Sequence, residues 1–72
     1  MTIEDYRAQA RARFGALTPY RLGFMVGLAD DDRALCPYEA WHSAQLFDQG
    51  HAAGLESRRR AQAALDRLAG MP

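Results

Sequence analysis

Two pairs of glycines constrain this chain of 72 residues more than any other feature of its sequence. Gly23 and Gly27 lie four residues apart, as do Gly50 and Gly54, and this spacing puts each pair on one face of a helix. The two pairs share a midpoint between Tyr38 and Glu39, at the end of the Cys36-Pro37-Tyr38 triplet. This symmetry predicts two antiparallel helices that fold back at the triplet, with Gly23 facing Gly54 and Gly27 facing Gly50.

A glycine inside a helix costs about 1 kcal/mol relative to alanine, so four of them need a physical reason. The favoured explanation is that the missing side chains let two helix backbones approach closely, a device best known from membrane helices. The alternative is that some of these glycines end helices as C-caps. For Gly50 the close-packing explanation is weakest.

The length and composition indicate a single small domain. A domain of about 60 residues buries only about 60% of its unfolded surface, so the helices must pack well or gain stability from a partner. Nine arginines balance nine acidic residues, which gives no basic excess of the kind that nucleic-acid binders usually show. The single cysteine, the absence of a secretory signal and the absence of a long apolar run favour a cytoplasmic protein without a membrane span.

Capping signals and apolar periodicity predict three helices and no strand, hence an all-α fold. Residues 1–17 are expected to form an additional N-terminal amphipathic helix, capped by Thr2 with Asp5 three residues later and stopped at Gly15. Residues 18–72 are expected to form the helical hairpin.

Within the predicted hairpin, one helix should run from Pro19 to Ala29 and end at the acidic residues 30–32. A second should run from Pro37 to about Leu68, with Cys36 at its cap. The expected inner stripe of this helix comprises Trp41, Ala44, Phe47, Gly50 or His51, and Gly54, continued by Ala61, Ala64, Leu65 and Leu68.

No catalytic or metal-binding constellation emerges from the sequence. Cys36, His42 and His51 do not have the spacing of a structural zinc site, and only His42 is near enough in sequence to activate the thiol. The acidic residues 30–32 with Glu39 lack the spacing of a calcium loop and suggest a solvated turn. The chain is therefore expected to be no enzyme and to need no cofactor or metal.

Arginines supply the only candidate nucleic-acid contacts. Arg58, Arg59 and Arg60 form the densest basic run, to which Arg7 and Arg11 would add if the first helix packs nearby. Such a run is more often solvated helix surface. The aromatic residues Tyr38, Trp41 and Phe47 could stack on RNA bases, but at helical spacing they are more often core residues.

The segment from Gly23 to about Arg58 resembles the ribosome modulation factor family, without a gap and over about half of the chain. The resemblance is carried by Gly23-Phe24-x-x-Gly27-Leu28-Ala29, by Cys36-Pro37-Tyr38, and by Phe47 and Gly50. It implies a small, mainly helical bacterial protein that binds rRNA and ribosomal protein and helps ribosomes into an inactive, hibernating form by occlusion. Arg33 and Arg58 stand where the family tends to have basic residues.

The chain also departs from that family. It is neutral rather than strongly basic, Asp31 stands at a usually basic position, and His51 replaces a usual tryptophan. Two hypotheses follow. The first is a ribosome-associated regulator of translation that binds through the arginines, slightly preferred because the match is ungapped. The second is a small protein–protein interaction module of the same fold, with a protein partner or a second copy as a homodimer, and without nucleic-acid binding. Neither hypothesis requires a membrane or a small-molecule substrate.

Overall fold

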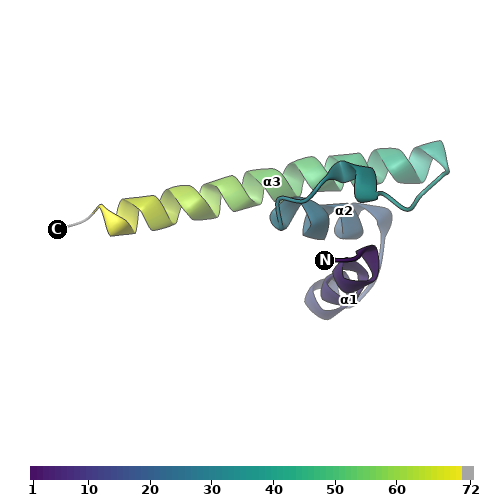
Figure 1. Cartoon of the computed structure of the whole chain (residues 1–72), viewed down its shortest axis with the longest axis horizontal. Helices are drawn as coiled ribbons and strands as arrows, with labels where there is room; N and C mark the ends of the chain where they lie inside the picture. Colours follow the sequence, from purple (N-terminus) through teal and green to yellow (C-terminus); the bar gives the residue numbers. More distant parts are fainter. Residues whose placement is uncertain (71–72) are drawn as a thin grey trace.

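The computed structural model describes residues 1–70, and all its regular elements are helices (Figure 1). They are α1 (Ile3–Phe14), α2 (Pro19–Leu28), the short 3-10 helix η1 (Arg33–Leu35) and α3 (Trp41–Ala69). The molecule measures 50 × 22 × 19 Å because α3 extends far beyond the other elements. The predicted all-α fold is confirmed for the described residues. The predicted second unit, 18–72, ends in residues 71–72, which lie outside them.

Helix α1 begins and ends where its sequence signals predict. The Thr2 hydroxyl accepts a hydrogen bond from the Asp5 backbone N–H, and the Asp5 carboxylate accepts one from the Thr2 backbone N–H at 2.9 Å. Gly15 ends the helix in the left-handed conformation at φ 74°. Tyr6 and Ala10 are the buried residues of α1, and the helix packs on α2.

Helix α2 is the most buried element, as its nearly continuous apolar sequence predicts. The Thr18 hydroxyl caps it by accepting from the Arg21 backbone N–H at 3.2 Å, and Pro19 occupies its first turn. Leu22 and Val26 are completely buried. Together with Tyr6, Ala10, Met25 and Phe47 they form the core cluster.

The end of α2 shows how the acidic run stops the helix. Asp30 adopts the left-handed conformation at φ 57°. Its N–H donates to the Gly27 carbonyl at 2.9 Å, and the Asp31 N–H donates to the Val26 carbonyl at 3.0 Å. These two bonds make a Schellman motif in which an aspartate takes the position usually held by glycine. The chain therefore turns back at Asp30 and does not continue as helix.

All four paired glycines lie at the contact between α2 and α3, so the close-packing explanation is confirmed. A Cβ added to Gly23 or Gly27 would lie closer than 3.0 Å to the backbone carbonyl of Phe47 or His51, respectively. Gly50 and Gly54 meet the backbone of α2 in the same way, at residues 20 and 24. Neither glycine of α3 is a C-cap, because both lie inside the helix.

The predicted antiparallel hairpin is wrong, because the contact register shows that α2 and α3 run parallel. Position 23 meets 47 and position 27 meets 51, so residue numbers rise together along the two helices. The expected pairs Gly23–Gly54 and Gly27–Gly50 are consequently not formed. The physical reason lies in residues 29–40, which return along the whole length of α2 before α3 begins, where the prediction assumed a tight corner (Figure 1).

Helix α3 also starts later than predicted, at Trp41 rather than Pro37. A residue that precedes proline avoids the helical region, and Cys36 accordingly has ψ 119° and ends η1. Cys36 is therefore not the N-cap of α3. Ala40 occupies that position, without a side-chain hydrogen bond. Trp41, expected in the inner stripe, is 76% exposed because it stands at the open end of α3.

Candidate functional site

The arginine run lies on α3 just beyond the point where α2 ends. Arg58 donates from Nη1 to the Leu28 carbonyl at 3.2 Å, which places it beside the last turn of α2. Arg59 and Arg60 each donate to the Glu56 carboxylate at 3.2 Å, yet their side chains remain 77% and 80% exposed. The single Glu56 carboxylate therefore pairs with two arginines. Residues 58–60 of α3 keep a net positive charge that is exposed to solvent.

The other candidate arginines occupy different elements. Arg7 lies on α1 and pairs with Glu4 at 2.6 Å, and Arg11 is exposed one turn later on the same helix. Arg33 begins η1 in the segment that returns along α2. Within residues 1–70, no hydrogen bond or ion pair links any of these three to the arginine run on α3. The six arginines are thus distributed over three elements.

The Cys-Pro-Tyr triplet and Phe47 belong to the structural framework. The ring of Tyr38 packs against that of Phe47 with centroids 6.3 Å apart, and burial raises the pKa of the Tyr38 hydroxyl. The Cys36 thiol lies 3.9 Å from the Tyr38 carbonyl oxygen, to which it donates. The contact between Tyr38 and Phe47 holds the returning segment against α3.

A polar cluster that joins α1, the connection after α2, and α3 was not predicted from the sequence. The Tyr6 hydroxyl donates to the Asp31 carboxylate at 2.7 Å, and His51 Nε2 donates to the Asp31 carbonyl at 2.7 Å. The hydrogen bond to Asp31 raises the pKa of Tyr6 to about 12 and lowers that of Asp31. Each residue is unremarkable by itself, and no sequence signal connects positions 6, 31 and 51.

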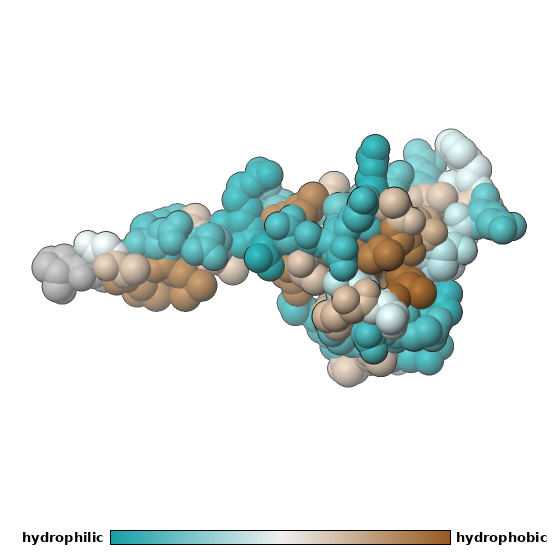
Figure 2. Space-filling view, viewed as in Figure 1, coloured by the Kyte–Doolittle hydropathy of each residue, from teal (hydrophilic) through white to brown (hydrophobic). Residues whose placement is uncertain are grey.

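The C-terminal part of α3, residues 58–69, projects from the body of the molecule; we call it the arm (Figure 1). Every residue of the arm is exposed. The continuation of the inner stripe, expected to be buried, lies in solvent: Leu65 is 59% and Leu68 65% exposed. Figure 2 shows hydrophobic surface along one side of the arm. We call Ala61, Ala64, Leu65 and Leu68 the apolar stripe.

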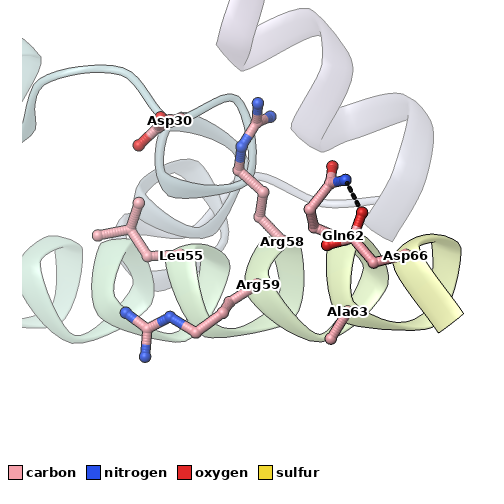
Figure 3. A pocket seen from close by; sticks show the side chains of 7 residues that line it. All are labelled: Asp30, Leu55, Arg58, Arg59, Gln62, Ala63 and Asp66. Atoms are coloured by element: carbon pink, nitrogen blue, oxygen red, sulfur yellow. Dashed lines mark hydrogen bonds between the residues drawn. The ribbon is translucent and has the colours of Figure 1, made fainter. Parts of the chain in front are cut away.

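A shallow open groove lies at the base of the arm, between α3 and the end of α2. Figure 3 shows Arg58 reaching from α3 toward the loop that carries Asp30, while Arg59 and Ala63 point to the other side. Gln62 donates to the Asp66 carboxylate at 3.0 Å along the same helix. The groove is lined by Asp30, Leu55, Arg58, Arg59, Gln62, Ala63 and Asp66. Its open shape and mixed polarity suit contact with a surface more than enclosure of a small molecule.

Within residues 1–70, no three His, Cys, Asp or Glu side chains gather closely enough to hold a metal ion. None of the helices in that part of the chain combines the length and apolarity needed to cross a bilayer. Comparisons with protein-family models, curated proteins and solved structures found no match to this chain.

Proposed function

We propose that this chain is a non-catalytic binding protein that docks on a larger partner through the arm, residues 58–69. The observation that carries the proposal is that the arm leaves the core as a helix with both leucines exposed. Isolated helices shorter than about 12–15 residues are marginal in water. The arm continues a helix whose first half is packed on α2, so it is presented in a helical conformation before any partner arrives.

The first candidate partner is the ribosome. The segment from residue 23 to 58 resembles the ribosome modulation factor family, and the exposed Arg58-Arg59-Arg60 turn offers charges to rRNA phosphates. Exposed ion pairs contribute only about 0–1 kcal/mol, so a phosphate can replace Glu56 as the partner of Arg59 and Arg60. Such binding would regulate translation by occluding a ribosomal surface, without any chemical step.

The second candidate is a protein–protein interaction module, with a protein partner or a second copy of the chain. The specific observation in its favour is the exposed apolar stripe, which phosphate contacts would leave in solvent. The net charge of zero also supports it, because phosphate neutralisation supplies most of the non-specific affinity for nucleic acid.

Sedimentation of cell lysates through a sucrose gradient distinguishes the two candidates. A ribosome-binding chain should travel with ribosomal particles from stationary-phase cells at low salt. Changing Arg58, Arg59 and Arg60 together to glutamine should release it and lower the slope of log affinity against log salt by about 2–3 units, since about three phosphate contacts are lost. Arg13→Gln, an exposed change on α1 outside the candidate set, is the matched control and should bind like the wild type.

A wild-type chain that stays in the top fractions at low salt would contradict the ribosome candidate and leave the interaction module. Light scattering on the purified chain then separates a homodimer from a protein that needs a different partner. Circular dichroism of the triple variant checks that loss of the hydrogen bond from Arg58 to Leu28 has not unfolded it.

A further inference from the structure

We propose that the apolar stripe binds an amphipathic helix of a partner protein. That partner helix carries acidic residues along both borders of its own apolar face. This inference rests on the proposed docking through the arm and names the kind of partner. It differs from the arginine contacts to rRNA in its central surface, the apolar stripe, although Arg58 and Arg60 border that stripe and belong to both candidate surfaces.

The apolar stripe lies on the same face of α3 that packs against α2. At about 100° per residue, Ala61, Ala64, Leu65 and Leu68 fall in line with Gly50 and Gly54 along the helix. Since α2 ends at Leu28, the seam that it covers beside residues 47–54 continues uncovered along the arm. A partner helix would therefore occupy the place that a longer α2 would take, over about 17 Å for residues 58–69.

The small residues Ala61 and Ala64 allow a partner helix to approach closely, and the two leucines supply the apolar area. Burying a leucine side chain that otherwise stands in solvent favours association. A surface of this size suits a helix packed side by side, with Leu65 and Leu68 inserted between its side chains. It is too small to hold the arm on a lipid bilayer by insertion.

The charges beside the stripe select an acidic partner. On a helical wheel, Arg58 and Arg60 lie about 70° and 90° from the centre of the stripe, one on each side. The acidic residues of this part of α3, Glu56 and Asp66, lie about 130° and 150° away, on the far face. Both borders of the stripe are thus basic, and Glu or Asp beside the apolar face of a partner helix would meet opposite charges.

The same charge pattern argues against a second copy of the chain as the occupant. Two arms packed parallel would bring Arg58 of one copy near Arg60 of the other. Packed antiparallel, they would bring Arg60 near Arg67 of the other copy, while Glu56 and Asp66 would still point away. Like charges at such borders disfavour association, so self-association through the stripe is expected to be weak.

Binding of designed peptides to the full chain tests the proposal. The probe is an alanine-based helix of about 18 residues with leucines at its a and d positions and glutamates at its e and g positions. The control peptide carries lysines in place of the glutamates. Fluorescence anisotropy should show the glutamate peptide binding at least about tenfold more tightly than the lysine peptide.

Variants of the arm identify the surface used. Leu65→Gln with Leu68→Gln should weaken binding of the glutamate peptide by at least about tenfold. Both changes are exposed and glutamine is a good helix former, so the fold should be kept. Ala63→Gln, on the opposite side of the arm, should leave binding unchanged.

Three results would overturn the inference. They are equal binding of the two peptides, no binding of the glutamate peptide up to about 1 mM, and binding that survives the double leucine change. A dimer in sedimentation equilibrium that the leucine change dissociates would instead assign the stripe to a second copy. A wild-type chain that binds the glutamate peptide but does not sediment with ribosomes would reject the ribosome candidate alone. A wild-type chain that sediments with ribosomes but does not bind the peptide would reject this inference alone.

Discussion

At Gly27 the backbones of α2 and α3 touch, and substitution of this residue tests how much the fold depends on that contact. Because an added Cβ would meet the His51 carbonyl group closer than 3.0 Å, the Gly27→Ala change must push the helices apart. Overpacking typically costs 1–3 kcal/mol, so urea unfolding should show a loss of about 2 kcal/mol despite the better helix propensity of alanine.

The matched control for Gly27→Ala is Gly70→Ala, at the C-terminal end of α3. A Cβ there would come no closer than 3.4 Å to another atom, and its φ of −84° suits alanine. We expect this variant to unfold within about 0.5 kcal/mol of the wild type. Equal stability of Gly27→Ala and Gly70→Ala would contradict backbone contact at Gly27.

The sequence was sufficient to predict which glycines lie at the contact between α2 and α3. It was not sufficient to predict which residues of the other helix those glycines meet. Four helical glycines with no capping geometry are costly unless backbones approach, so their position followed from local energetics. Their partners depend on the register between two helices. That register is set by the path of residues 29–40, about which neither spacing nor propensity carries information.

At the scale of elements, the direction of α3 relative to α2 was the main feature that sequence reasoning missed. The symmetry of the glycine pairs about the end of the Cys-Pro-Tyr triplet is also compatible with a parallel pair, provided that the connection is long enough to return along α2. Asp30 in the left-handed conformation starts that return, and the proline at 37 keeps the segment extended until Ala40. The helix ends themselves were predictable from Thr2, Thr18 and Gly15, because caps are local signals.

The hydrogen bond from Tyr6 to Asp31 fastens α1 to the connection after α2, and it makes the attachment depend on pH. The folded-state pKa of Tyr6, about 12, lies above its ordinary value of 10.0. The stabilisation is therefore complete below pH 10 and is lost as pH rises from about 10 to 12. Asp31 has a lowered pKa, so its contribution is present above its ordinary value of 3.8 and is lost as pH falls through the lower folded-state value.

Comparing the wild type with Tyr6→Phe by urea unfolding across pH measures this effect. The variant should be less stable at pH 7, because it lacks the hydroxyl that Asp31 accepts from. The difference should stay constant up to about pH 9 and shrink above pH 10. A difference that is absent at pH 7, or that does not change in alkali, would show that this hydrogen bond does not hold α1.

At the scale of the whole molecule, α1, α2 and the first half of α3 form a compact body, from which the arm extends. The body explains why the glycines and the Cys-Pro-Tyr triplet are present, since they build the contact and the connection. The apolar stripe follows from no packing requirement within residues 1–70, because every residue beyond position 57 is exposed there. Sequence periodicity revealed the stripe and the early end of α2, but it could not show that no other element packs on the stripe within residues 1–70.

Amide hydrogen exchange on the purified chain at low concentration tests most directly whether the arm is an exposed helix on which no other part of the chain packs. The account predicts that amides of residues 47–54 exchange slowly, near the limit set by global unfolding, because they lie at the glycine contact. Amides of residues 60–69 should be protected at least about a hundredfold less, because nothing packs on them and the helix frays from its end. Protection of the arm equal to that of residues 47–54 would contradict the account.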